Sequence, residues 1–221
     1  MKKDSQASLR INPDDIGYAI SHIGAMAREE EVVVDPVAYS YATVANALRD
    51  FGFDSTVEAN FDQVVRYKCA LRAGVARRGL CLMGNVGTGK SLAMKFINGG
   101  GYRAQSLVRL YGKCREVFED QCYGMPDLNV EIPVLTIDDL GAEPTYNDFG
   151  TKLEVMDELI SLREVMFDER GHITNVTTNL SEAELDDRYG PRLMSRLKKM
   201  TNIVVFTGPD RRRTGNEEFM R

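Results

Sequence analysis

The spacing of hydrophobic residues changes near residue 79. Upstream of it, apolar side chains recur every three or four positions in three segments, which is the period of amphipathic helices. Pro13 and Pro36 open two of these segments, as proline favours the first helical position, and Gly52 and Gly74 close two of them. The pattern therefore predicts helices over residues 12–31, 35–53 and 60–74.

Downstream of residue 79, short apolar runs alternate with amphipathic segments. The runs predict strands over residues 79–84, 104–112, 131–141, 172–180 and 201–208. The segments between them predict helices over residues 92–98, 114–124, 148–170 and 181–200, the last broken near Gly190. Strands that alternate with helices form a parallel sheet covered on both faces. We therefore expect an α/β domain in residues 61–221, preceded by a small helical module in residues 1–60.

Composition excludes several classes of protein. The hydrophobic content of 43% supports a full core. No run approaches the roughly 20 apolar residues of a membrane helix, and the start, MKKDSQASLR, does not resemble a secretory signal. We expect a cytoplasmic protein without a membrane partner. The four cysteines form no CxxC pair and there are only two histidines, so reduced thiols and no histidine-based metal site are expected.

Negative charge is concentrated near the N-terminus. Residues 1–60 hold 5 of the 28 basic and 10 of the 33 acidic residues, so residues 61–221 hold 23 of each. The N-terminal part thus accounts for the whole net charge of −5. Basic residues gather again late in the chain, at Arg188, Arg192, Arg196, Lys198, Lys199 and Arg211–Arg213. The overall charge argues against a protein that coats DNA but leaves room for a local basic face.

A phosphate-binding loop is indicated by the stretch GNVGTGKS. It matches the pattern G-x-x-x-x-G-K-[ST], and it follows a predicted strand and precedes a predicted helix, as that motif requires. In such a loop the backbone N–H groups hold phosphate oxygens, the lysine reaches the β- and γ-phosphates and the hydroxyl ligates Mg²⁺. The alternative is an ordinary glycine-rich turn. The candidate nucleotide-binding residues are Gly84, Asn85, Val86, Gly87, Thr88, Gly89, Lys90 and Ser91.

Two acids close the predicted strand PVLTIDDLG. Ligands of open α/β sheets bind at the carboxyl ends of strands, where Asp138 and Asp139 emerge. We expect Asp138 to hold Mg²⁺ together with Ser91, and Asp139 to orient or deprotonate the attacking water. The alternative is a pair of solvated surface acids, which the presence of the phosphate loop makes less favoured.

Two further segments offer polar groups. The strand that contains NVTTNLS ends in Asn179, which could hold the attacking water or sense the γ-phosphate. Equally, Asn179 with Ser181 could cap the next helix. In YGPRLMSRLKKM, Arg192 and Arg196 stand four residues apart on one helical face, and an arginine can stabilise a transferring phosphoryl group. The alternative is that both are surface charges.

These motifs, in this order, resemble those of AAA+ ATPases and, more narrowly, of the DnaC/DnaI helicase loaders and the IstB transposition helpers. GNVGTGKS resembles their Walker A motif, LTIDDLG their Walker B motif, TTNLS their sensor 1 and YGPRLMSRL their arginine-finger segment. The resemblance covers about residues 61–208. It implies a P-loop NTPase fold, ATP and Mg²⁺ as cofactors, and Mg²⁺-dependent ATP hydrolysis. By position Arg196 aligns best with the arginine finger, and Arg192 is the second candidate.

The chain departs from this family pattern in two places. Many AAA+ enzymes have a glutamate where this chain has Asp139, although this branch tolerates aspartate. A full helical lid is not expected after VVFTGPDRRR, and nothing assigns a role to Arg211–Arg213.

The resemblance implies an ATP-dependent helicase loader, which self-associates on ATP and delivers a replicative helicase to DNA. In the family the N-terminal region contacts the partner. Single-stranded DNA is a further candidate partner, along a basic face that includes Lys198 and Lys199. The alternatives are a transposition helper that recruits a transposase, a nucleotide-gated adaptor with little turnover, and a small-molecule kinase. The paired acids favour activation of water over transfer to a small acceptor.

Overall fold

The computed structural model describes residues 36–53, 60–125, 130–148, 150–208 and 210. All of them belong to one compact unit, Pro36–Arg221, which is separate from Met1–Asp35. The helix predicted over residues 12–31 and the basic run Arg211–Arg213 lie outside the described residues. Within the described part of the chain, no helix combines the length and the apolar composition that crossing a bilayer requires.

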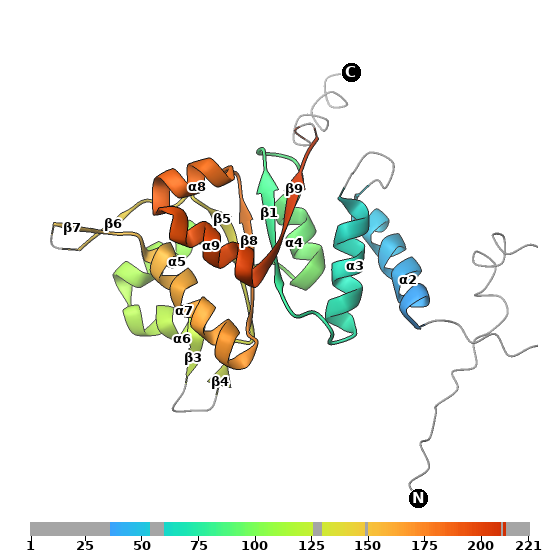
Figure 1. Ribbon diagram of the computed structural model, residues 1–221, viewed down its shortest axis with the longest axis horizontal. Coiled ribbons are helices and arrows are strands. Elements are labelled where there is room, and N and C mark those ends of the chain that lie inside the picture. The colour runs from blue at the N-terminus through green and yellow to red at the C-terminus, as the bar shows by residue number, and fades with distance from the viewer. Residues whose placement is uncertain (1–35, 54–59, 126–129, 149, 209, 211–221) are drawn as a thin grey trace, which may run out of the picture. The chain divides into compact units, whose positions relative to one another are not determined.

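Helices and strands alternate from residue 79 onward (Figure 1). The helices are α2 (Pro36–Asp50), α3 (Phe61–Arg72), α4 (Lys90–Asn98), α5 (Ala104–Lys113), α6 (Arg115–Tyr123), α7 (Val155–Arg170), α8 (Glu182–Tyr189) and α9 (Pro191–Met200). The strands are β1 (Gly79–Gly84), β2 (Tyr102–Arg103), β3 (Gly124–Met125), β4 (Val130–Glu131), β5 (Val134–Leu140), β6 (Tyr146–Asp148), β7 (Thr151–Leu153), β8 (Ile173–Thr178) and β9 (Thr201–Phe206).

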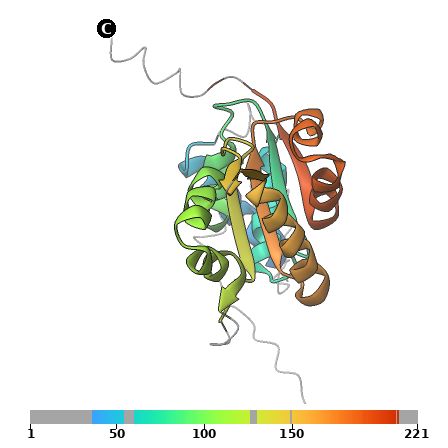
Figure 2. The same cartoon turned by 90° about the vertical axis from the view of Figure 1, so that its left-hand side faces the viewer.

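Five parallel strands form the central sheet in the order β2-β5-β8-β1-β9. Strand β1 lies inside the sheet: Cys81 pairs with Val176 of β8 on one side and with Ile203 of β9 on the other. Viewed along the sheet, α5 and α6 lie on one side of it and α7–α9 on the other (Figure 2). The α/β class, with a parallel sheet covered on both faces, is confirmed.

Alternating side chains of β1 enter two hydrophobic clusters. Leu80 and Leu82 pack with residues of α2, α3, α4 and β9. Cys81 and Met83 pack in the larger cluster, to which α5–α9, β5 and β8 contribute. Because successive side chains of a strand point to opposite faces, β1 is held from both sides. Its carboxyl end, where the phosphate loop begins, is thereby anchored in the core.

Helix α2 packs on α3 and belongs to this core. Val44, Ala45 and Leu48 of α2 are buried in the same cluster as Val64 and Val65 of α3. The described part of residues 1–60 therefore contributes to the core beside β1. The division into a module of residues 1–60 and a domain of residues 61–221 stays a prediction, because much of the first segment lies outside the described residues.

Two local predictions are wrong. Residues 104–112, predicted as a strand, form helix α5, because Ala104, Leu107 and Val108 are spaced for one helical face and all three are buried. The strand at this point is only β2, two residues long. The helix predicted from residue 148 begins at Val155, because the preceding residues pair as the β6–β7 hairpin. The β3–β4 hairpin, in which Gly124–Met125 pairs with Val130–Glu131, was not predicted. The remaining elements within the described residues match the predicted strands and helices in type.

Candidate nucleotide-binding site

The loop between β1 and α4 turns at three glycines with positive φ and leads into a helix N-terminus. Gly84, Gly87 and Gly89 have φ angles of 139°, 81° and 96°, which L-residues with a Cβ rarely adopt. Gly84 also lies close to the neighbouring strand, since a Cβ there would lie 2.2 Å from the carbonyl oxygen of Phe206. The loop ends at the N-terminus of α4, where the free N–H groups favour anions. This is the geometry that phosphate oxygens require.

Lys90 is the first residue of α4 and is only 4% exposed. Its Nζ donates hydrogen bonds to the carbonyl oxygens of Gly84 and Asn85, each at 2.7 Å, and to Oδ1 of Asn179 at 2.8 Å. Thr88 Oγ1 closes the loop further by donating to the Asn85 carbonyl oxygen at 2.9 Å. The Lys90 ammonium group is therefore hydrogen-bonded to two carbonyl oxygens of its own loop and to Asn179, the residue that follows β8.

Asp138 and Asp139 lie in a bulge of β5. The pairing of β5 with β8 runs in register to Ile137 and resumes at Leu140, so that the two acids lie opposite the single residue Thr177. Asp139 has a φ of 60°, which makes it the one described non-glycine residue with positive φ. Bulges and positive φ values are frequent beside active sites, where they redirect side chains.

Thr177 supports this bulge, and sequence analysis did not identify it. Its hydroxyl donates to Asp138 Oδ1 at 2.6 Å and accepts from the backbone N–H of Asp139 at 3.0 Å. One hydroxyl thus satisfies both the carboxylate and the N–H group that the bulge removes from the ladder. Nothing in the local sequence marks Thr177, because its role depends on the register of β8 against β5.

Asn179 joins the loop to the acids. Its Oδ1 accepts from Lys90, and its Nδ2 donates to Asp139 Oδ1 at 3.2 Å. The helix-capping role falls instead to Ser181, whose hydroxyl accepts from Glu184 N while the Glu184 carboxylate accepts from Ser181 N. The structure therefore brings Lys90, Asn179 and Asp139 together in one hydrogen-bonded chain.

The donor set fits a magnesium ion bound with a nucleotide. Ser91 lies in the first turn of α4, and Asp138 lies at the end of the strand β5. Of the Asp138 carboxylate, only Oδ1 has a hydrogen-bond partner among the described residues. Mg²⁺ prefers one or two protein oxygen ligands together with phosphate oxygens and water. No cluster of three acid, histidine or cysteine side chains that could hold a metal ion occurs among the described residues.

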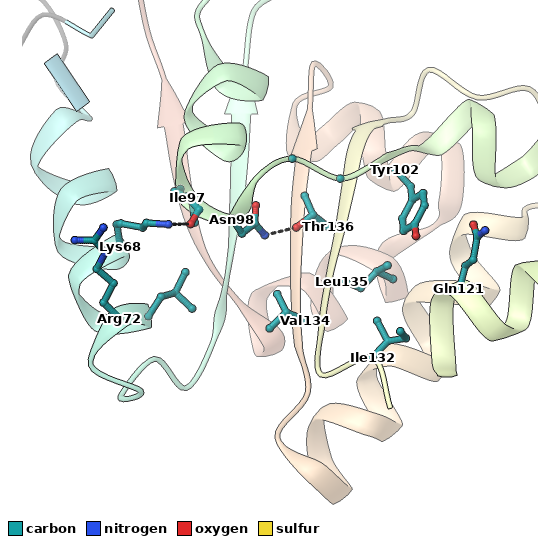
Figure 3. A pocket seen from close by; sticks show the side chains of 13 residues that line it. Lys68, Arg72, Ile97, Asn98, Tyr102, Gln121, Ile132, Val134, Leu135 and Thr136 are labelled. Atoms are coloured by element: carbon teal, nitrogen blue, oxygen red, sulfur yellow. Dashed lines mark hydrogen bonds between the residues drawn. The ribbon is translucent and has the colours of Figure 1, made fainter. Parts of the chain in front are cut away.

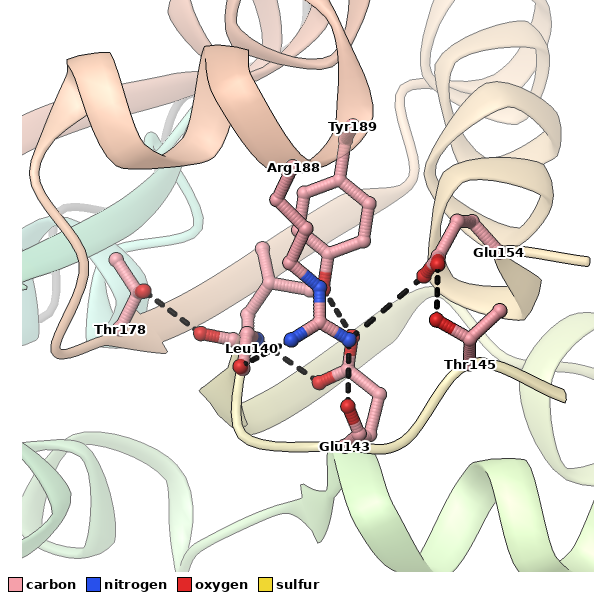
Figure 4. A network of polar contacts seen from close by, with 8 residues as sticks. Leu140, Glu143, Thr145, Glu154, Thr178, Arg188 and Tyr189 are labelled. Atoms are coloured by element: carbon pink, nitrogen blue, oxygen red, sulfur yellow. Dashed lines mark hydrogen bonds and ion pairs between the residues drawn. The ribbon is translucent and has the colours of Figure 1, made fainter.

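A buried network links the bulge to the end of α8 (Figure 4). The Glu143 side chain is 1% exposed, and its carboxylate accepts hydrogen bonds from the Tyr189 hydroxyl and from the Gly141 N–H. Arg188 donates to the carbonyl oxygens of Gly141 and Glu143 and pairs with the carboxylates of Glu143 and Glu154. Burial, followed by the charge of Glu143, raises the pKa of Tyr189, which keeps that phenol protonated. Sequence analysis missed this network because its members are some 45 residues apart.

The late basic residues differ in their surroundings. Arg196 is half-buried and forms ion pairs with Asp157 at 2.9 Å and Glu164 at 3.3 Å, both on α7. Arg192 is exposed. Lys198 pairs with Glu182, and Lys199 pairs with Glu164 and Asp168. The ammonium groups expected to form a basic face are thus neutralised by neighbouring carboxylates.

Comparison with known proteins identifies the fold. No protein-family model matches the chain, and no curated protein matches it. The solved DnaI structure matches over 75% of this chain and 94% of its own, at 21% identity and a TM-score of 0.53. A solved DnaC helicase loader matches over 67% of this chain and 91% of its own, at 21% identity and a TM-score of 0.45. The chain therefore has the P-loop α/β fold expected from its motifs, which is the fold of the solved DnaI structure.

Proposed function

We propose that this protein is a Mg²⁺-dependent ATPase of the helicase-loader type, which assembles on ATP and delivers a replicative helicase to DNA. The observation that carries the proposal is the hydrogen-bonded chain Lys90–Asn179–Asp139. It joins Lys90 at the start of α4, Asn179 just after β8 and Asp139 near the carboxyl end of β5. Open α/β sheets bind ligands at the carboxyl ends of their strands. The fold shared with DnaI supports the same assignment.

In this proposal each residue has one task. The N–H groups of residues 84–91 bind the phosphates, and Lys90 turns from its loop carbonyls to the β- and γ-phosphate oxygens. Ser91 and Asp138 would hold Mg²⁺, which when bound would supply charge neutralisation at the phosphate oxygens. Asp139 accepts a proton from the attacking water or orients it, and Asn179 holds the Asp139 carboxylate in place. Asn179 forms hydrogen bonds with both Lys90 and Asp139. A movement of Lys90 toward the γ-phosphate would therefore change the hydrogen bonding of the Asp139 carboxylate.

Replacement of Lys90 by Ala should weaken nucleotide binding by about 10- to 100-fold, because it removes a charged hydrogen-bond donor to the phosphates. The measurement is titration of a fluorescent ATP analogue with Mg²⁺. The matched control is Lys95→Ala, which removes an exposed lysine from the same helix. Unchanged affinity of Lys90→Ala would place the nucleotide elsewhere and refute the site.

Arg196 is proposed to act on the nucleotide of a neighbouring subunit. Asp157 and Glu164 hold its guanidinium in the isolated chain, and a transferring phosphoryl group would compete for it. Arg196→Ala should bind ATP normally and lose most of the stimulation of hydrolysis on assembly, with an arginine-finger effect of up to about 10³-fold. Phosphate release at rising protein concentration measures this effect.

Arg192→Ala is the control for Arg196, because Arg192 lies one turn earlier on α9. If Arg192→Ala loses the stimulation while Arg196→Ala keeps it, the finger is Arg192. The partner is tested separately by co-purification with a replicative helicase and with a transposase. Retention of the transposase alone would identify a transposition helper.

A further inference from the structure

A cavity lies at the opposite end of the sheet strands from the phosphate loop (Figure 3). Its volume is about 510 Å³, within the range of small-molecule sites. It is lined by Val134, Leu135 and Thr136, the first residues of β5, whereas the phosphate loop follows the last residue of β1. Because β1 and β5 are parallel within one sheet, the two sites lie at different ends of the strands.

The walls of this cavity combine apolar and aromatic surface. Leu71 and Ile97 form part of it from α3 and α4, Val134 from the start of β5, and Ile132 from the segment between β4 and β5. Tyr102, on the edge strand β2, also lines it and is 43% exposed, so its ring is available for contact. Val134 is 42% exposed. A planar apolar group would therefore bury surface that the described residues leave exposed.

The charged residues of the lining are Lys68 and Arg72, both from α3, and no carboxylate is among the lining residues. Lys68 Nζ donates to the carbonyl oxygen of Ile97 and lies 5.9 Å from the centre of the Phe96 ring. Within the described part of the chain, neither cation forms an ion pair. Burial, which is the larger cause, and the nearby charge of Arg72 both lower the pKa of Lys68. The cavity thus favours an anion, unlike the neutralised Lys198 and Lys199.

Hydrogen-bonding groups without partners complete the site. Asn98 Nδ2 donates to Thr136 Oγ1, but Asn98 Oδ1 is buried and has no hydrogen-bond partner. Gln121 lies on the far side of the cavity, from α6. Between them, Gly100 and Gly101 expose backbone in place of side chains. A buried acceptor without a donor is costly, so a ligand that donates an N–H group would be favoured.

We propose that this cavity binds a nucleotide unit of single-stranded DNA. Lys68 and Arg72 would contact the phosphodiester, Tyr102 would stack on the base, and the amides of Asn98 and Gln121 would contact its edge. An anion carried on a flat, N–H-bearing apolar ring matches these groups better than an acidic peptide, whose carboxylates would leave the aromatic and apolar walls unused. The inference rests on the proposed loading function and deepens it by naming where the DNA strand lies.

The test is fluorescence anisotropy of a labelled oligothymidylate of about 20 nucleotides, titrated with the full chain at several salt concentrations. The variant Lys68→Met/Arg72→Met keeps the apolar stems and removes both charges. It should bind at least about tenfold more weakly, and the plot of log K against log salt should become shallower by about 0.7, the value for one phosphate that is no longer neutralised. Tyr102→Leu should weaken binding by about tenfold, as expected when one base no longer stacks.

The matched control is Lys198→Met/Lys199→Met, which removes two cations that are already ion-paired and should bind within about twofold of the wild type. Equal binding by the Lys68/Arg72 variant and the wild type would overturn the inference, as would a wild type that does not bind the oligonucleotide. A poly-glutamate peptide that displaces the oligonucleotide, when both are present at equal concentrations of negative charge, would overturn the DNA inference and indicate a peptide site. ATP hydrolysis is measured for the same variants in the absence of DNA, so that a failure of DNA binding is distinguished from a failure of the ATPase proposal. Absence of hydrolysis by the wild type would contradict the ATPase proposal, whatever the DNA-binding result.

Discussion

Asp139→Asn should bind Mg²⁺-ATP with unchanged affinity and hydrolyse it about 10²- to 10⁴-fold more slowly, the range for loss of a general base. The variant suits this position for a structural reason. Asp139 has a φ of 60°, and asparagine is among the residues that best tolerate that conformation. The bulge and the Thr177 hydrogen bond to the residue 139 N–H should therefore survive, so that only the negative charge is lost.

Single-turnover phosphate release, compared with equilibrium binding of the same variant, measures this effect. The matched control is Asp157→Asn, which neutralises a carboxylate on α7 that pairs with Arg196 and has no contact with the phosphate loop. That control should keep its basal rate when measured at protein concentrations too low for assembly. Equal turnover of Asp139→Asn and wild type would exclude Asp139 as the residue that activates water.

Arg163→Ala should lower the free energy of unfolding by about 3–5 kcal/mol. Arg163 of α7 is fully buried, and within the described part of the chain it has no carboxylate partner. Its guanidinium donates to Thr174 Oγ1 at 2.9 Å and to the carbonyl oxygens of Ile132 and Ile173 at 2.8 and 2.9 Å. These bonds fasten α7 to the amino ends of β5 and β8.

Two opposing effects decide the size of this change. Burial lowers the pKa of Arg163 to about 10, so removal of the charge relieves an unfavourable burial worth roughly 3 kcal/mol. Against this, four oxygen acceptors lose their donor at about 1–3 kcal/mol each, the fourth being the Cys122 carbonyl oxygen at 3.3 Å, and a large cavity forms. The second effect is larger, so the protein is destabilised.

Urea unfolding of three variants tests this prediction. Arg163→Met refills most of the volume, so it should fall between Arg163→Ala and the wild type, and its remaining difference from the wild type isolates the missing hydrogen bonds. Arg170→Ala, on the same helix, removes an exposed ion pair to Glu131 and should cost less than about 1 kcal/mol. If Arg163→Ala unfolds at the same urea concentration as Arg170→Ala, the guanidinium does not fasten α7 to the sheet.

Most of the fold could be predicted from local patterns. The strands 79–84 and 201–208 and the break near Gly190 follow from runs and breakers in the sequence, and the structure matches them. The wrong predictions of secondary structure concern segments whose local pattern fits both a strand and a helix. Residues 104–112 are a short segment with many apolar positions, which strands and helices share, and the burial of Ala104, Leu107 and Val108 on one helical face gives the answer.

The candidate site likewise contains residues that the local sequence predicts and contacts that it does not predict. The loop of residues 84–91 and the acids Asp138 and Asp139 were predicted because each depends on neighbours in sequence: glycines that permit positive φ, and carboxylates at the exit of an apolar strand. Arg196 was singled out as a finger, but its pairing with Asp157 and Glu164 of α7 is not visible in the local sequence.

By itself, the sequence determined the glycine-rich loop of residues 84–91 with its phosphate-loop pattern, the paired acids and the α/β domain, because these are encoded by short-range spacing. The tertiary structure alone decided that Asn179 bridges Lys90 and Asp139, that Thr177 supports the bulge, and that Lys198 and Lys199 are neutralised. The reason is physical: hydrogen bonds and ion pairs are short-ranged, and the strand order β2-β5-β8-β1-β9 places residues about 40 to 90 positions apart within about 3 Å of one another.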